Sequence, residues 1–501
     1  MKKFTLALSL FIFTAKLATA QNQSIQAHKI DTISANVAAE FVKAGPGRAI
    51  SVGVIQNGKI YLHNYGTIEK GVNLPPTNQT LYEIGSMTKT FTSIILAHAV
   101  LEKRVKPDDD IRKYLSGSYP NLEYAGKPIQ LIHIVNLTSG LPNNMPIPPD
   151  ADAMSHMRSD SMAAAFMKLH KGYTREKFLQ ELHAVKLDTV PGINPRHSNA
   201  AAELLGYILE NVYHQSLPAL VKKYIAGPLG MSHTFLTTPP ANLVRAKGYT
   251  DRGDLMPYIP YPDNYAFGME STIEDMTKYI QFHLEEKDPA VKITHQAAWG
   301  NINQFALGWN WFMGTSADGK RNINNDGTTL GFTAATLLYP AQHFAVMILT
   351  NEYDNNSNDR LEQSARRIYE ECNYTLAERS SLGFGFSPAI NKLLNALNKQ
   401  GFDHAEEVAA ALKKSGTKFD LPENDVNNWA YFLMRKGKQT QAHEIFKLNV
   451  ALYPQSWNAY DSLAESYLNM GNKELAIRNY KHSLELNPQN TNAVEQLKKL
   501  Q

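Results

Sequence analysis

A serine and a lysine three residues apart, Ser86 and Lys89, are the clearest candidates for chemistry in this 501-residue sequence. They lie where a coil should give way to a strongly apolar helix, Thr88–Leu101, so both side chains would share one face at the helix start. A serine at this place could be a helix N-cap with no other role. However, a capping box places an acid three residues later, and here that position holds a cation against the positive end of the helix dipole. Because burial and the helix end both disfavour a charged amine, the pattern predicts a base able to take the serine proton.

The Ser-x-x-Lys spacing is weak evidence by itself, since Ser415 and Lys418 share it in a polar segment with no apolar helix behind it. We interpret that second copy as chance. The sequence has no Gly-x-Ser-x-Gly elbow, no His-Glu-x-x-His helix and no phosphate-binding glycine loop. Its one cysteine, Cys372, excludes an intrachain disulfide, thiolate zinc clusters and iron–sulfur centres.

The charge balance argues against a nucleic-acid partner. Lys and Arg number 50 against 47 Asp and Glu, and the surplus cations Lys2, Lys3 and Lys16 all lie in the first twenty residues. The rest of the chain therefore has no cationic excess to attract a phosphate backbone.

The first twenty residues have the pattern of a secretory signal: two lysines, an apolar stretch, and small residues before a polar segment. We predict cleavage after Ala20 and a secreted or periplasmic protein. About a dozen apolar residues cannot cross a ~30 Å hydrocarbon layer. No later segment reaches eighteen apolar residues, so we expect no membrane anchor in the mature chain.

Alternating and helical hydrophobic patterns predict an α/β (α+β) domain, with one antiparallel sheet built from both ends of residues 21–374 and helices between them. The dipeptide Asn57-Gly58 between two β-rich runs predicts a hairpin with a type I′ turn. The expected strands are residues 49–54, 59–65, 333–339 and 343–350. The expected helices are 88–101, 175–182, 200–212, 273–284 and 358–371.

The tail repeats itself with a period of thirty-four residues, which is the tetratricopeptide period. Gly437, Ala442, Phe446 and Pro454 recur as Gly471, Ala476, Tyr480 and Pro488. We predict a tetratricopeptide repeat domain over 421–501 and a linker with packing helices over 375–420. Helices at 390–398, 404–414 and 492–500 would complete the stack. Such a tail would contact a protein partner or brace the first domain.

Several further motifs follow the serine along the chain. Because of these motifs and their order, the chain resembles the serine β-lactamase and penicillin-binding protein superfamily, in its class C and D-alanyl-D-alanine carboxypeptidase branch. The resemblance covers residues 37–351 and implies a β-lactamase/transpeptidase-like fold with a sheet and an all-helical lobe. The motifs are Thr138-Ser139-Gly140-Leu141-Pro142, Pro191-Gly192, His197-Ser198-Asn199, the run from Phe267 to Thr272 with Asp275, and Gly331-Phe332.

The resemblance implies a role for each matching residue. Ser86 becomes the nucleophile, Lys89 its proton acceptor, and Asn199 an amide that orients the substrate. Gly327 belongs to the third motif, and the N–H of Thr328 would join that of Ser86 in an oxyanion hole.

Two positions depart from the family pattern. His197 stands where the family usually has tyrosine; an imidazole can also transfer protons near neutral pH, although a plain loop histidine is the alternative. Asn325 stands where the family has lysine or histidine, followed by Asp326. Because this strand then offers no cation to a substrate carboxylate, we expect weak or no β-lactamase activity.

The sequence thus predicts an exported serine hydrolase that cleaves an ester, amide or peptide through an acyl-enzyme and needs no metal or cofactor. Two alternatives stay open: a D,D-carboxypeptidase or β-lactamase, and a catalytically degenerate binding or scaffold protein. The methionine-rich insertion 143–171 could cover the cleft, or its methionines could fill a helical core.

Overall fold

The structure is a computed structural model, and it divides the chain after Asn373 into two units that we describe separately. It describes residues 26–45, 47–148, 159–259, 264–302, 305–375, 378–379, 382, 384, 386, 388–414 and 419–500. The predicted signal segment and the second Ser-x-x-Lys copy lie outside these residues. Among the described helices, none has both the length and the apolar character needed to cross a membrane.

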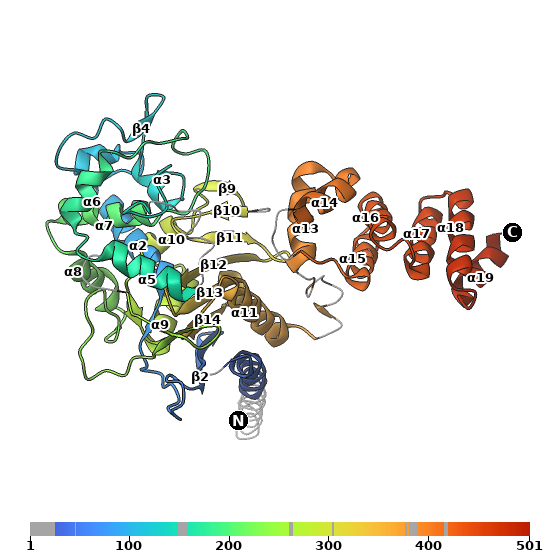
Figure 1. Ribbon diagram of the computed structural model, residues 1–501, viewed down its shortest axis with the longest axis horizontal. Helices are drawn as coiled ribbons and strands as arrows, with labels where there is room; N and C mark the ends of the chain where they lie inside the picture. The colour runs from blue at the N-terminus through green and yellow to red at the C-terminus, as the bar shows by residue number, and fades with distance from the viewer. Residues whose placement is uncertain are drawn as a thin grey trace, which may run out of the picture. The chain divides into compact units, whose positions relative to one another are not determined.

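An antiparallel sheet of eight strands forms the centre of the first unit (Figure 1), in the order β2-β1-β14-β13-β12-β11-β10-β9. The first strand pairs with the last along its length, from Ile50 opposite Thr350 to Gln56 opposite Phe344. This confirms the predicted fold class and the assembly of the sheet from both ends of the unit. The strands are β1 (Ala49–Gln56), β2 (Lys59–Gly66), β9 (Trp299–Asn301), β10 (Phe305–Leu307), β11 (Phe312–Thr315), β12 (Arg321–Thr328), β13 (Thr333–Tyr339) and β14 (Phe344–Thr350).

The two predicted hairpins differ in how well the sequence fixes their turns. Asn57 and Gly58 both have positive φ, 52° and 77°, as a type I′ turn requires. The second hairpin turns through Pro340–Gln342, and His343 has a left-handed φ of 48°. The strand therefore begins at Phe344 and not at His343, because a left-handed residue cannot continue an extended ladder.

Helices cover both faces of the sheet, and every residue of β13 and β14 is buried. On one face Tyr369 of α11 (Ser357–Asn373) stacks on Tyr339 and meets the edge of Phe344. On the other face Met347 and Leu349 join the main apolar core. That core includes α9 (Ile273–Glu285) and α2 (Thr88–Leu101). The alternation of side chains along β14 thus fills two separate layers.

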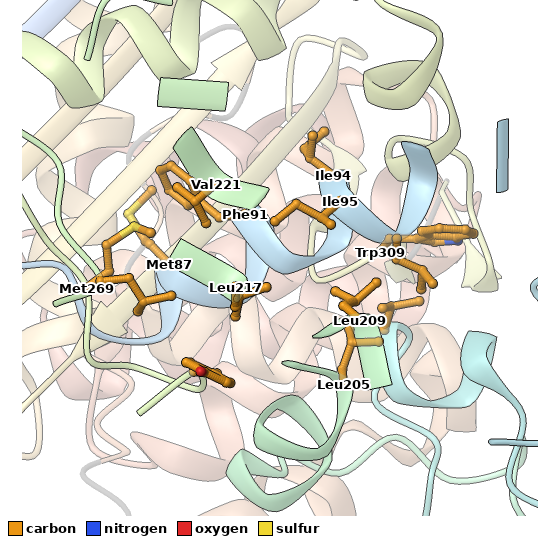
Figure 2. Packing of buried hydrophobic residues seen from close by; sticks show 14 of the residues in the cluster. Met87, Phe91, Ile94, Ile95, Leu205, Leu209, Leu217, Val221, Met269 and Trp309 are labelled. Carbon is orange, nitrogen blue, oxygen red and sulfur yellow. The ribbon is translucent and has the colours of Figure 1, made fainter. Parts of the chain in front are cut away.

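The helix that follows Ser86, α2, has eleven of its fourteen residues buried. Figure 2 shows Phe91 and Ile95 of α2 among Leu205, Leu217 and Val221 from two neighbouring helices. A helix that is apolar on all sides must be surrounded, so α2 is held firmly at the centre of the helical lobe. The lobe contains α3 (Leu131–Val135), α5 (Ser159–His170), α6 (Arg175–Leu182), α7 (Asn199–Tyr213), α8 (Leu217–Val221) and α10 (Pro289–Thr294).

The described part of the second unit is all helical. Ala442 and Ala476 are fully buried at corresponding places of two helix pairs, where a small side chain lets the helices approach. The predicted helix 404–414 begins at Ala405, because Phe402–His404 form a separate 3-10 turn. The all-helical tail agrees with helical repeats. Its helices are α13 (Pro388–Gln400), α14 (Ala405–Lys414), α15 (Glu423–Arg435), α16 (Gln439–Leu452), α17 (Trp457–Asn469), α18 (Lys473–Leu486) and α19 (Thr491–Leu500).

Candidate active site

Ser86 lies in a short turn at the entrance to α2. Gly85–Met87 form one turn of 3-10 helix, and the α-helix begins at Thr88. The side chain of Ser86 does not cap the helix; instead its Oγ lies 2.8 Å from the Nζ of Lys89. The two side chains therefore share one face, as the spacing predicts, and the hydroxyl is left for other chemistry.

Lys89 is 3 % exposed, and its Nζ makes three short contacts. Besides Ser86 Oγ, it donates to Asn199 Oδ1 at 2.8 Å and to the carbonyl oxygen of Ala266 at 2.9 Å. Burial lowers the pKa of Lys89 to about 7, although the charges of Asp326 and Glu203 act to raise it. When the amine loses one proton, Asn199 Oδ1 and the Ala266 carbonyl oxygen still accept hydrogen bonds from its two remaining N–H groups. Its lone pair then points at the Ser86 hydroxyl, which is the geometry of a general base.

The start of α7 carries Asn199, and the preceding residues bring His197 to the same cleft. Ser198 is the N-cap of this helix and accepts from the N–H of Ala201 at 2.9 Å. The same hydroxyl donates to the carbonyl of Pro142 at 2.7 Å, which ties the helix start to the segment after the Thr138–Pro142 motif. His197 Nε2 lies 3.5 Å from Ser86 Oγ. Desolvation in the cleft and the charge of Lys89 hold the pKa of His197 below its ordinary range.

Two glycines let strand β12 approach the turn that carries Ser86. A Cβ on Gly85 would lie 2.4 Å from the backbone nitrogen of Thr328, and one on Gly327 would lie 2.6 Å from that of Ser86. Gly85 also has a positive φ of 55°. The backbone N–H groups of Ser86 and Thr328 are therefore close neighbours, as an oxyanion hole requires.

Asn325 differs from the other predicted site residues because its side chain binds a backbone carbonyl away from the Ser-Lys pair. It is 7 % exposed, and its Nδ2 donates to the carbonyl of Asn310 at 2.9 Å. Its Oδ1 is buried without a hydrogen-bond partner among the described residues. Asn310 in turn donates to Ser93 Oγ in α2 at 2.8 Å. Asn325 thus connects β12, through Asn310, to α2 behind Lys89.

Asp326 lies on the opposite face of β12 from Asn325. Burial and the neighbouring Glu362 raise the pKa of Asp326 to about 6, while the charge of Lys89 acts in the other direction. The strand thus supplies an acid close to Lys89, where the resemblance leads one to expect a cation nearby.

Sequence reasoning missed several groups that complete the site. Asn143 Oδ1 lies 2.7 Å from His197 Nδ1, and Asn144 Oδ1 accepts from Asn199 Nδ2 at 2.7 Å. The pair of asparagines directly after the Thr138–Pro142 motif was an available signal. The carbonyl of Ala266 had none, because every residue type carries one.

The methionine-rich insertion is described over residues 143–148, where Met145 joins the main apolar core, and from Ser159, where α5 packs at the rim of the site. Phe166 and Met167 of this helix pack in a small apolar cluster with Phe267 and Leu330. Phe267 follows the residue that binds Lys89, and Leu330 lies two residues after Thr328. A cavity of about 50 Å³ lies beside Asn199, lined in part by Tyr173, Phe178, Tyr207 and Phe267. Among the residues that the structure describes, no group of three or more His, Cys, Asp or Glu side chains is placed to hold a metal ion.

Comparisons with known proteins place this site in a family. The model of the beta-lactamase family matches residues 35–370. Protein flp of Staphylococcus aureus (strain N315) is 27 % identical over 323 residues, which cover 61 % of this chain and 59 % of that protein, so the match spans about three fifths of the relative's length. A beta-lactamase of Pseudomonas fluorescens is 26 % identical over 342 residues, 60 % of this chain and 88 % of that protein.

Two solved structures share the fold of the first unit. A beta-lactamase/D-alanine carboxypeptidase from Yersinia pestis, complexed with citrate, is 22 % identical with a TM-score of 0.56, and the match covers 70 % of this chain and 99 % of that one. A class C beta-lactamase, also 22 % identical, gives a TM-score of 0.55 and covers 70 % and 96 %. With the family model matching more than half of its length and the Ser-Lys pair in place, this chain belongs to the beta-lactamase family.

Proposed function

We propose that the protein is a serine hydrolase that cleaves an ester or amide bond through an acyl-enzyme on Ser86. One observation carries the proposal: a buried amine lies 2.8 Å from the serine hydroxyl, and its other two contacts are fixed acceptors. An amine with a pKa of about 7 is about half neutral at pH 7, so it can act as a base there.

The reaction divides between groups on three elements. Neutral Lys89 takes the proton of Ser86 Oγ while the oxygen attacks the substrate carbonyl carbon. The N–H groups of Ser86 and Thr328 stabilise the oxyanion, and the leaving group departs with the proton that Lys89 took from Ser86. Water then attacks the acyl carbon, the bond to Ser86 Oγ breaks, and the acid product is released.

The charges around β12 favour an uncharged substrate. The resemblance leads one to expect a lysine or histidine at position 325, but the asparagine there is buried and neutral, and Asp326 adds an acid beside it. A carboxylate bound at the Asn325 face would find no compensating cation on this strand, and Asp326 on the opposite face adds negative charge to the strand and no positive charge. We therefore place uncharged esters ahead of anionic β-lactams.

Labelling of Ser86 and the relative kcat/KM values of two substrate classes together test the proposal. A fluorophosphonate probe should label the purified chain and fail to label Ser86→Ala of equal thermal stability. Uncharged aryl esters should react with a higher kcat/KM than penicillins. Absence of labelling on folded protein would contradict the hydrolase and favour the scaffold alternative, and a faster reaction with penicillins would contradict the substrate class.

β-Lactam or D-alanyl peptide hydrolysis is the second candidate, because relatives in both comparisons carry those names. The oxyanion hole and the Ser-Lys pair would serve that reaction equally. The penicillin measurement above, extended to a D-alanyl-D-alanine peptide, separates this candidate from the ester hydrolase.

We also infer that the chain is exported by its first twenty residues and that its repeat tail binds a protein partner. The apolar segment and the small residues at Ala18-Thr19-Ala20 support the first inference, and the thirty-four-residue period supports the second. Amino-terminal sequencing of the protein from the culture medium or periplasm should begin at Gln21. A mature chain that keeps residues 1–20 in the cytoplasm would contradict export.

A further inference from the structure

The hydrogen bond between Asn143 and His197 decides where the imidazole carries its proton. Asn143 Oδ1 lies 2.7 Å from His197 Nδ1. An amide oxygen can only accept, so the proton must be on Nδ1. In the neutral ring Nε2 is then a bare acceptor, and it is this atom that lies 3.5 Å from Ser86 Oγ.

The side chain that accepts from His197 Nδ1 is an amide and not a carboxylate, and this difference affects the charge of the imidazole ring. A carboxylate in this place would favour the imidazolium, which has no acceptor at Nε2. The amide fixes the same orientation without that charge. The ammonium of Lys89, which is the charged group that acts on the ring, works in the same direction and disfavours a second cation.

Asn143 is itself held by backbone contacts that do not involve its side chain. Its carbonyl oxygen accepts from the N–H of Asn199 at 2.7 Å and from that of Ala200 at 3.3 Å, both at the start of α7. Ser198 Oγ donates to the carbonyl of Pro142 beside it. A substitution at Asn143 therefore removes the contact to His197 and leaves the segment attached to the helix.

We propose that Asn143 is a positioning residue that holds His197 in the tautomer with Nε2 free, so that His197 serves as the base for the second half of the reaction. This inference rests on the proposed function. Nε2 accepts a proton from the attacking water while the water oxygen bonds to the acyl carbon. As the bond from that carbon to Ser86 Oγ breaks, Nε2 returns the proton to Oγ. The products are the free acid and the regenerated serine.

The division of labour gives a kinetic signature. Lys89 activates Ser86 for acylation, so Asn143→Ala should leave the acylation burst and fluorophosphonate labelling within about threefold of wild type. The steady-state kcat should fall by about 10–100-fold, because a positioned base contributes that much or more. His197→Ala should show the same split, and Asn143→Ala/His197→Ala should be no slower than His197→Ala alone.

Two further variants separate positioning from simple support of the fold. Asn143→Asp keeps the hydrogen-bond acceptor but adds a negative charge, which raises the pKa of His197. In its pH profile, the rise of kcat should therefore lie at higher pH, and above that rise kcat should exceed that of Asn143→Ala. Asn194→Ala removes an exposed amide of the loop that carries His197, whose Nδ2 donates to Thr189 Oγ1, and should leave kcat and its pH profile unchanged.

The outcomes distinguish this inference from the proposed function. If every variant is labelled at Ser86 but Asn143→Ala turns over at the wild-type rate, Asn143 does not position the base. Additive losses in the double variant, or a fall in acylation equal to the fall in kcat, would also overturn the inference. Absence of labelling in the wild type would instead reject the hydrolase itself.

Discussion

Lys89 is a buried amine whose usefulness as a base comes at a cost in stability. Burial lowers the pKa of Lys89 to about 7, against 10.5 for a free side chain. Between these two values the unfolded chain holds one proton more than the folded chain, so rising pH stabilises the folded wild type. Below pH 7 the full cost of burying the charged amine remains.

Replacement of this amine by an apolar side chain should therefore separate stability from activity. Lys89→Met should abolish ester turnover yet unfold at a higher denaturant concentration at pH 7. Its advantage in the free energy of unfolding should shrink by up to about 1.4 kcal/mol per pH unit between pH 7 and 10. Urea titrations of both proteins at several pH values measure this difference. An advantage that grows with pH would contradict the depressed pKa.

The same pKa sets the pH dependence of acylation. Only neutral Lys89 can take the serine proton, so kcat/KM for an uncharged ester should rise through an apparent pKa near 7 and then level off. The carboxylate of Asp326 acts to raise the pKa of Lys89. Asp326→Asn should therefore shift this limb to lower pH by about half a unit. A limb that stays in place, or moves up, would show that Asp326 has no electrostatic effect on the base.

At the scale of elements, the approach of strand β12 to the turn at Ser86 depends on a missing side chain. A Cβ on Gly327 would lie 2.2 Å from the carbonyl oxygen of Ile84, which is shorter than any allowed contact with backbone. Gly327→Ala should push the strand away and lower kcat/KM by about 100-fold or more, as the loss of an oxyanion donor does. Gly319→Ala, in the turn that leads into the same strand, meets no atom within 4 Å; its left-handed φ of 76° makes the variant less stable, but the folded protein should keep its activity. Equal rates for Gly327→Ala and the wild type would mean that the Thr328 N–H does not contribute.

The sequence predicts elements well where local chemistry is sufficient to form them. The β1–β2 hairpin follows from Asn57-Gly58, and α2 follows from its long apolar run. The strands β9, β10 and β11 were not predicted, because segments of three or four residues show no alternation and exist by pairing with their neighbours. The same holds in the site. The Ser-Lys pair is local, whereas the contact between Asn143 and His197 depends on the packing of segments fifty-four residues apart.

At the scale of the whole molecule, the two units have separate apolar cores. The main core of the first unit extends along the chain to Leu349, and the larger core of the second contains residues from Ile390 onward. A unit with its own core can fold alone. The exact end of the first unit matters for a truncation, because two hydrogen bonds reach its last residues: Lys29 Nζ donates to the carbonyl of Cys372, and Gln56 Nε2 donates to Asn373 Oδ1.

A chain that ends after Asn373 should therefore retain the reaction, whereas one that loses α11 should not. Truncation at Asn373 keeps the contacts to Lys29 and Gln56, so kcat/KM for an aryl ester should stay within about twofold of the full chain, since inter-domain surfaces contribute little to a site enclosed in one unit. Truncation after Ser357 removes Tyr369 from its stack on Tyr339 and uncovers one face of the sheet, so that protein should fail to fold. Calorimetry of the full chain should show two transitions, with the one belonging to the second unit absent from the Asn373 truncation. An inactive but folded Asn373 truncation would mean that the second unit takes part in catalysis, because nothing within the first unit would have changed.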